Sequence, residues 1–289
     1  MPSGKILVTG ANGQLGKELA VAASRVAQFE FVFLSKEDLD IDDVQKVHDF
    51  FTRTKPDYCI NCAAYTAVDK AETESQKAFQ INATAVGVLA GACKQAGTRL
   101  IHVSTDYVFD GNSSRPLNEE DPTGPVNIYG SSKLAGEQLA LRHNEQTLVI
   151  RTSWVYSQFG NNFVKTMIRL MAERETVKVI NDQIGSPTYA ADLADLILLI
   201  AASGKFVSGI YHYSNLGETS WFEFAQTIQE LIGSTCQIVP IPTSEYPTPA
   251  KRPKYSLLDK GKIVNTYGVQ IPYWRDSLAR CIGKIKSQQ

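Results

Sequence analysis

The sequence of 289 residues predicts an α/β fold, a Rossmann-type doubly wound parallel sheet with a smaller C-terminal substrate-binding lobe. Two observations carry this prediction. Short apolar runs alternate with helical patterns as far as residue 152, and the first run leads directly into glycines at positions 10, 13 and 16. Such alternation is typical of a parallel sheet that is covered by helices on both faces.

The expected elements follow one another in chain order. We expect strands at 5–9, 29–34, 57–63, 99–104 and 147–152. Helices are expected from about residue 14, over 42–51 and 75–95, and around 128–137. Within 42–51 the apolar residues Val44, Val47, Phe50 and Phe51 keep the spacing of one helical face.

The glycine turn "GANGQLG" after the first strand indicates a dinucleotide site. Between a strand and a helix, Gly10 permits a tight turn, Gly13 allows a pyrophosphate to approach, and Gly16 allows close helix packing. The helix amino end then offers free N–H groups to the phosphates. The candidate cofactor residues of this turn are Gly10, Asn12, Gly13, Gln14, Leu15 and Gly16.

The end of the second strand bears on the choice of dinucleotide. An acidic residue there would favour NAD, whereas this chain has Ser35 and Lys36. A hydroxyl and a cation suit a 2′-phosphate, so we expect NADPH, with NADH left open because Glu37 and Asp38 lie within a register slip. Asp40 is a further cofactor candidate in this segment.

Composition narrows the function classes. The net charge is −1 with no long basic run, so we expect neither nucleic acid nor a membrane as a partner. No apolar run is long enough to cross a bilayer, and the amino end lacks a signal-peptide pattern, so we expect a cytoplasmic protein. The five cysteines are scattered, and Cys59 and Cys62 are expected to be core thiols.

Beyond residue 153 the alternation loosens, and prolines gather at 240–253, which indicates a long ordered loop or a lid. We therefore expect a dinucleotide-binding domain at 1–152 plus about 189–214. The substrate-binding lobe would comprise 153–188 and 215–289.

Tyr129 and Lys133 lie four residues apart in "IYGSSKLAGE" and should share one helical face. Together with "TAVDKAE", "STDYVFDG", "RTSWVY", "GNNFVKTM", "DQIGSPT" and "AKRPKYS", this motif resembles the short-chain dehydrogenase/reductase superfamily, in its extended, nucleotide-sugar branch. The similarity extends over nearly the whole chain. It implies reduction of the 4-keto group of dTDP-4-dehydro-6-deoxy-L-mannose by hydride from NADPH or NADH.

The resemblance implies a role for each matching residue. Tyr129 would protonate the substrate oxygen, Lys133 would hold the nicotinamide ribose and lower the pKa of Tyr129, and Thr105 would hydrogen-bond the carbonyl. Lowering a tyrosine pKa from about 10 to about 7 needs about 4 kcal/mol. One charge about 4 Å away supplies roughly that at an effective dielectric near 20. Ala63, Ala64 and Tyr65 would border the cofactor, together with Tyr129 and Lys133.

The same matching gives the substrate side. Trp154 would pack against the sugar, Val68 and Tyr107 would shape its pocket beside Asp106 and Thr105, and Asn162 with Arg252 would meet the nucleotide diphosphate. Arginine suits a diphosphate because its planar fork donates two hydrogen bonds at once.

Two kinds of alternative remain beside the reductase, and a third, a 4,6-dehydratase, is disfavoured. A 4,6-dehydratase would need a second carboxylate after Asp106, where this chain has Tyr107. A 4-epimerase or another nucleotide-sugar ketoreductase would keep the same hydride chemistry. A dinucleotide-binding regulatory subunit would keep the fold without turnover.

Some family members bind magnesium through glutamates at a dimer interface. Glu18 matches one such position, but Ala191 stands where another glutamate would be expected. We therefore predict no metal and leave a homodimer open.

Overall fold

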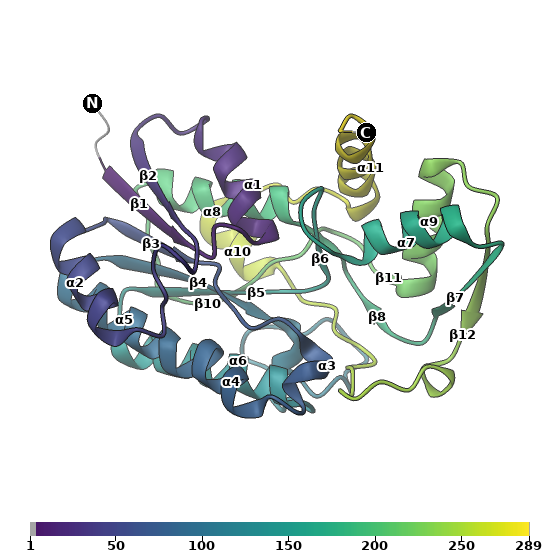
Figure 1. Cartoon of the computed structure of the whole chain (residues 1–289), viewed down its shortest axis with the longest axis horizontal. Helices are drawn as coiled ribbons and strands as arrows, with labels where there is room; N and C mark the ends of the chain where they lie inside the picture. The colour runs from purple at the N-terminus through teal and green to yellow at the C-terminus, as the bar shows by residue number, and fades with distance from the viewer. Residues whose placement is uncertain (1–3, 289) are drawn as a thin grey trace.

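One six-stranded parallel sheet forms the centre of the molecule in the computed structural model (Figure 1). Residues 4–288 are described; Gln289 and residues 1–3, part of the amino end in which we expect no signal peptide, lie outside. Neighbouring strands pair in parallel in the order β10-β5-β4-β3-β1-β2. The strands are β1 (Gly4–Thr9), β2 (Phe29–Leu34), β3 (Tyr58–Asn61), β4 (Arg99–Thr105), β5 (Thr147–Thr152) and β10 (Gly209–His212). The predicted fold class is confirmed.

Helices cover both faces of this sheet (Figure 1). One face carries α1 (Gln14–Ala23), α8 (Ala190–Ala202) and α10 (Gly261–Tyr267), and the other carries α2 (Val44–Thr54), α5 (Ala85–Ala96) and α6 (Ile128–His143). In β1, Ile6 and Val8 face the first layer while Leu7 faces the second, and all three are fully buried. A strand with apolar residues on both sides is expected at the centre of a parallel sheet.

The helix expected over 75–95 is interrupted. The chain forms α3 (Val68–Ala71), then α4 (Ser75–Phe79), a π-helical segment (Gln80–Thr84) and α5. The wider π turn carries Asn82, whose side chain accepts from the Tyr65 N–H at 2.8 Å and donates to the Tyr65 carbonyl at 3.0 Å. On α6, a Cβ at Gly136 would lie only 2.0 Å from the Asn82 carbonyl oxygen, so these helices can approach closely only at a glycine.

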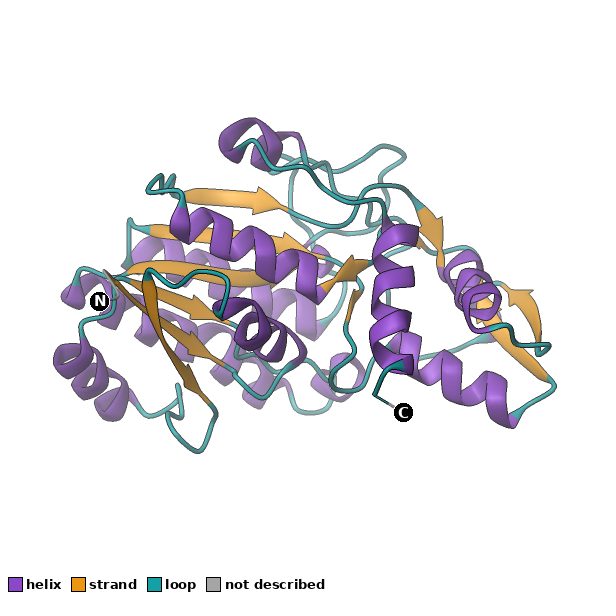
Figure 2. Cartoon of the chain, turned by 90° about the horizontal axis from the view of Figure 1, so that it is seen from above, coloured by secondary structure: helices purple, strands orange, loops and turns teal. Residues whose placement is uncertain are grey.

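A smaller lobe lies beyond the carboxyl ends of the strands (Figure 2). It has its own apolar core, to which Tyr156, Phe224 and Leu278 contribute. Its helices are α7 (Phe163–Glu173), α9 (Trp221–Ile232) and α11 (Trp274–Lys286), and its parallel strand pair is β7 (Thr176–Ile180) with β12 (Gln237–Ile241). The remaining short elements are β6 (Val155–Tyr156), β8 (Ile184–Gly185), β9 (Thr188–Tyr189), β11 (Thr219–Ser220) and the 3₁₀ turns Asp106–Val108 and Thr243–Glu245.

The exact domain boundaries stay a prediction. Ile263, Val269 and Ile271 fall within the range expected for the lobe, yet they pack in the core beneath the large sheet. The loop expected over 240–253 begins later, because residues 240 and 241 pair with β7.

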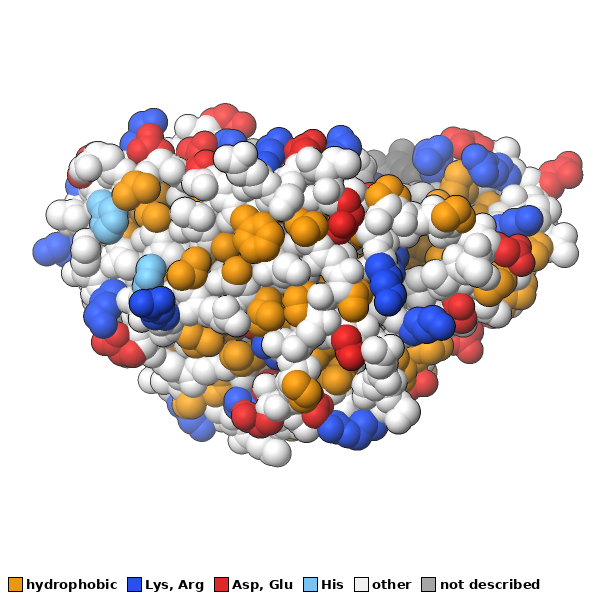
Figure 3. Space-filling view, turned by 90° about the horizontal axis from the view of Figure 1, so that it is seen from below, with side chains coloured by type: hydrophobic (Ala, Val, Ile, Leu, Met, Phe, Trp, Pro, Cys, Tyr) orange, Lys and Arg blue, Asp and Glu red, His pale blue; other side chains and the backbone are white. Residues whose placement is uncertain are grey.

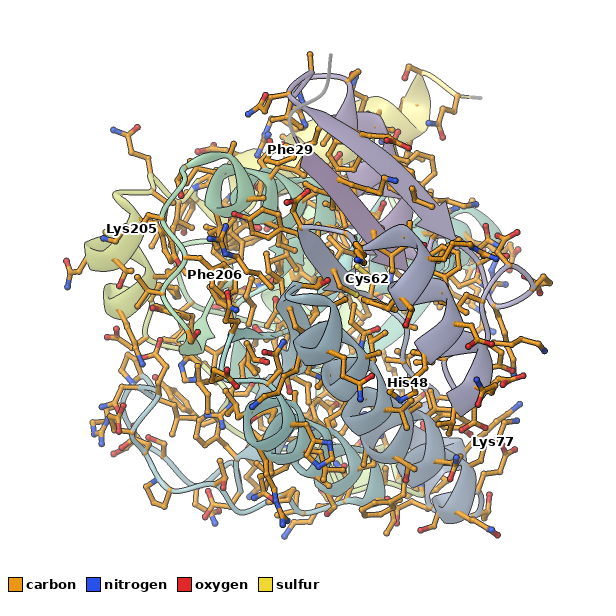
Figure 4. The ribbon with its side chains drawn as sticks, turned by 90° about the vertical axis from the view of Figure 1, so that its left-hand side faces the viewer. Phe29, His48, Cys62, Lys77, Lys205 and Phe206 are labelled. Atoms are coloured by element: carbon orange, nitrogen blue, oxygen red, sulfur yellow. The ribbon has the colours of Figure 1, made fainter. Side chains whose placement is uncertain are left out.

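Aromatic side chains close the amino edge of the sheet. Tyr58 lies between Phe29 and Phe206, with ring centroids 6.0 Å from each. Figure 4 views the molecule from this end and labels both phenylalanines. At the carboxyl edge the chain leaves β1 toward β2 on one side and leaves β3 toward β4 on the other side. A ligand of an open α/β sheet binds at such a switch point.

Candidate active site

The glycine turn lies at the switch point between β1 and β3. Gly10 has a φ of +69°, and a Cβ there would lie 2.6 Å from the backbone nitrogen of Ala63. A Cβ at Gly16 would lie 2.5 Å from the Gly10 carbonyl oxygen. Gly13 caps α1 without any side-chain hydrogen bond, so the first N–H groups of the helix remain available to an anion. This cradle fits a dinucleotide pyrophosphate.

Two side chains far apart in the sequence meet above this turn. Gln14 Oε1 accepts a hydrogen bond from Asn162 Nδ2 at 2.9 Å. Asn162 also donates to the Ser157 carbonyl at 2.7 Å and caps α7 through Lys165 N–H. The structure thus places Asn162 beside the cofactor turn, while Leu15 packs into the core. The contact of Asn162 with a diphosphate stays a prediction.

The residues after β2 are already engaged with carboxylates. Ser35 Oγ donates to Asp38 at 2.7 Å, and Lys36 Nζ lies 3.5 Å from Asp40. The Lys36 side chain is 71% exposed. A ligand phosphate here would meet the long, exposed side chain of Lys36, whose charge Asp40 partly neutralises.

Residues 63–65 form the loop after β3. Asn61 Oδ1 accepts from Ala63 N–H at 3.2 Å, and Asn82 holds both backbone polar groups of Tyr65. The Tyr65 hydroxyl donates to Glu74 at 3.2 Å. This bracing keeps the backbone of the loop against Gly10.

The predicted catalytic residues come from two elements. Thr105 is at the carboxyl end of β4, and Tyr129 and Lys133 are in the first turns of α6. Asn127 caps α6 by accepting from Gly130 N–H at 2.7 Å, which fixes the start of the helix that carries Tyr129. Thr105 ends β4 and forms a hydrogen bond with Tyr129. Burial raises the pKa of Tyr129 to about 12, an effect that the Thr105 hydrogen bond opposes.

The expected lowering of the Tyr129 pKa by Lys133 is therefore wrong for the protein without ligand. Desolvation disfavours the phenolate, the charge of Asp106 adds to this rise, and the Thr105 hydrogen bond opposes it only in part. Lys133 Nζ instead donates to the Val103 carbonyl at 2.7 Å, and burial lowers the pKa of Lys133 to about 8. Glu137 raises that pKa in part, but Glu137 also pairs with Arg151 at 2.7 Å.

Two further predicted residues adjoin Tyr129. Asp106 is 2% exposed and accepts from Thr105 Oγ1 at 3.0 Å, and burial raises its pKa to about 6. Tyr107 packs edge-on against Tyr129 with ring centroids 5.6 Å apart. Val68 begins α3, which contacts α6.

Trp154 follows β5 in a strained backbone conformation. Its φ is +48°, in the left-handed region that non-glycine residues rarely adopt. Its ring stacks on Trp221 at 3.7 Å, and a Cβ at Gly185 would lie 3.0 Å from it. Strain of this kind persists only where surrounding packing imposes it, and it is concentrated at functional sites.

A cavity of about 800 Å³ opens in the smaller lobe next to these residues. Arg252 lines it, but its lining does not include the other predicted substrate residues, and most of its wall was not predicted. Those other residues are Val68, Thr105, Asp106, Tyr107, Trp154 and Asn162. The spacing of Phe163, Met167 and Leu170 on α7 is that of one apolar helical face and could have indicated it. Further lining comes from Arg174, Lys178, Gln183, Trp221, Tyr246 and Thr248.

One face of the molecule mixes charged side chains with apolar area. Seen from below, basic side chains are interspersed with hydrophobic ones where the main body meets the smaller lobe (Figure 3).

Within residues 4–288, no helix is both long and apolar enough to cross a membrane. The same residues include no group of three His, Cys, Asp or Glu side chains that could hold a metal ion.

The parallel sheet, the glycine cradle and the grouped Thr105, Tyr129 and Lys133 define an extended short-chain dehydrogenase/reductase. The chain belongs to the dTDP-4-dehydrorhamnose reductase family, since the family described as RmlD substrate binding domain matches residues 4–287. A dTDP-4-dehydrorhamnose reductase of Burkholderia thailandensis is 43% identical, over 98% of this chain and 100% of that protein.

Two solved structures resemble the chain closely. A dTDP-4-dehydrorhamnose reductase of Bacillus anthracis in complex with NADP is 41% identical, with a TM-score of 0.93 over 98% of this chain and 99% of that one. The Clostridium acetobutylicum reductase is 40% identical, with the same TM-score and the same coverage.

Proposed function

We propose that this protein reduces dTDP-4-dehydrorhamnose to dTDP-L-rhamnose with NADPH. The observation that carries the proposal is the grouping of Thr105, Tyr129 and Lys133 beside the glycine cradle. The relatives named above, similar over nearly their full lengths, support the choice of substrate.

NADPH is the preferred cofactor in this proposal, and NADH the weaker one. The cradle at Gly10, Gly13 and Gly16 would take the pyrophosphate. Ser35 and Lys36 would face the adenosine ribose, where a 2′-phosphate would compete with Asp40 for the Lys36 ammonium. Residues 63–65 would border the nicotinamide side.

Tyr129 acts as the proton donor in this mechanism. When bound, the dinucleotide supplies a hydride to C4 of the sugar. Because its pKa is raised to about 12, Tyr129 keeps its proton at neutral pH and can donate it to the carbonyl oxygen. The Thr105 hydroxyl positions that oxygen against the phenol. Lys133, protonated below about pH 8, holds the ribose and stabilises the phenolate once the proton has left.

The substrate would extend from this point into the cavity of the smaller lobe. Trp154 would pack on the sugar, and Val68 and Tyr107 would enclose it. Arg252 would meet the diphosphate, and Asn162 would approach it from the cofactor turn. The aromatic and apolar wall of the cavity suits a pyrimidine nucleoside.

The test follows NADPH absorbance while the purified protein meets freshly prepared dTDP-4-keto-6-deoxy-L-lyxo-hexulose, with product analysis. Tyr129→Phe should lower kcat at least about a hundredfold without changing NADPH affinity. Tyr273→Phe, at a 44% exposed tyrosine, is the matched control and should behave as wild type. NADPH binding without oxidation by the wild type would overturn the proposal, and product formation without net oxidation would indicate an epimerase.

A further inference from the structure

The segment 246–254, which we call the strap, crosses from the smaller lobe to the main body. Tyr246, Thr248 and Arg252 of the strap line the 800 Å³ cavity. The strap is fastened at its far end to α3 and to the start of α6, the helix that carries Tyr129 and Lys133. Asn127, which caps α6, donates through Nδ2 to the Lys251 carbonyl at 2.7 Å.

The principal fastening is Asp69, in the short helix α3. Its carboxylate accepts from Arg252 Nη1 at 3.0 Å and from Nη2 at 2.8 Å. The same carboxylate accepts from the Ala250 N–H at 3.3 Å. Arg252 lowers the pKa of Asp69, so the carboxylate is charged at neutral pH. One side chain therefore fixes both the backbone of the strap and the plane of its guanidinium.

The hydrogen bonds of Arg252 leave donors for a ligand. A guanidinium carries five N–H bonds. Asp69 takes one from each Nη, and the Ala250 carbonyl takes a second from Nη1 at 3.2 Å. Within residues 4–288 the Nε–H and the second Nη2–H have no recorded acceptor, and Arg252 faces the cavity. The ion pair thus orients the guanidinium and leaves two of its N–H groups available to a ligand.

We propose that Asp69 is a positioning residue, which holds the strap and presents Arg252 to the diphosphate of the substrate. This inference rests on the proposed function. Burial raises the pKa of the Tyr107 hydroxyl, Arg252 is close enough to oppose part of that rise, and Tyr107 packs edge-on against Tyr129 with ring centroids 5.6 Å apart. In this proposal Arg252 contributes equally to binding of the ground state and of the transition state, so its position affects KM and leaves the proton transfer from Tyr129 unchanged.

A double-mutant cycle on dTDP binding tests the proposal. Calorimetry compares wild type, Asp69→Ala, Arg252→Ala and the double variant. Hydrogen bonds to charged groups contribute enough for each single change to weaken dTDP binding about tenfold or more. The double variant should bind no more weakly than Arg252→Ala, because Asp69 acts only through Arg252.

Turnover separates positioning from a loss of folding. Asp69→Ala should raise KM for the nucleotide sugar about tenfold while kcat and the Kd for NADPH stay within about twofold. Asp69→Glu, which keeps the carboxylate, should recover part of the loss, and Asp69→Asn tests the charge if the alanine variant is unstable. Arg115→Ala removes a bidentate pair with Asp121 away from the cavity and should leave dTDP affinity, KM and kcat unchanged.

The proposal would be overturned if the two single substitutions weakened dTDP binding independently, so that their effects on Kd multiplied in the double variant. Tighter dTDP binding by Asp69→Ala would also overturn it, because the carboxylate would then only compete with phosphate. Failure of the wild type to bind dTDP would also overturn it. Failure of the proposed function is a separate result, in which the wild type binds dTDP in the cycle but oxidises no NADPH with the keto sugar.

Discussion

The buried carboxyl of Asp106 makes the stability of this protein depend on pH in a predictable way. Its pKa is raised from an ordinary value of 3.8 to about 6, because burial outweighs the hydrogen bonds from Ser256 and Thr105. A shift of about two units at about 1.4 kcal/mol each costs the folded state about 3 kcal/mol once the group is ionised. Asp106→Asn, which is neutral at every pH, should not carry that cost.

The sign follows from the direction of the shift. A raised pKa means that the folded protein favours the protonated form, so this contribution is complete below about pH 4 and is lost as pH rises through about 6. Urea unfolding at pH 4, 5, 6 and 7 gives the free energy of unfolding of both proteins. The value for Asp106→Asn should rise relative to that of the wild type by up to about 3 kcal/mol across that window. Above it the difference should be constant.

A control with the opposite sign strengthens the measurement. Arg115 lowers the pKa of Asp121, so Asp121→Asn should lose stability relative to wild type at neutral pH and approach it as pH falls. A difference between Asp106→Asn and wild type that does not change with pH would refute the reasoning.

Two further predictions concern cofactor binding. Gly16→Ala would place a Cβ 2.5 Å from the Gly10 carbonyl and should weaken NADPH binding at least about tenfold, measured by fluorescence titration. Gly91→Ala, with no atom within 4 Å of the added Cβ, is the matched control, and an equal loss there would contradict the cradle. Burial lowers the pKa of Lys133 to about 8, so kcat/KM for NADPH should fall as pH rises through about 8 and the ammonium is lost. A profile that stays level to pH 10 would show that the ammonium is not needed.

The succession of strands and helices along the first 152 residues could be predicted from the sequence because its signals are local. The expected strands at 29–34 and 147–152 match β2 and β5 exactly in extent. The interruption at Gln80–Thr84 could not be predicted, because it depends on Asn82 reaching Tyr65 and on Gly136 of another helix.

The electrostatics of the candidate site could not be predicted from the sequence, and the roles of its predicted residues stay a prediction. Helical spacing places Tyr129 and Lys133 on one face, but the pKa of each depends on burial by segments distant in the sequence. The pairing of Arg252 with Asp69 joins residues 183 positions apart, and no local pattern announces it. Such contacts are decided by tertiary packing.

The core beneath the large sheet draws on nearly the whole chain, from Ile6 in β1 to Ile271 ahead of α11. During synthesis the first strands and helices emerge long before α8 and α10, which must cover the same face as α1. Until then the apolar side of β1 and α1 has no complete cover, and exposed surface of this kind favours aggregation. The glycine turn that forms the cofactor cradle is therefore synthesised early, but the helices that complete the layer around it are synthesised only with the last part of the chain.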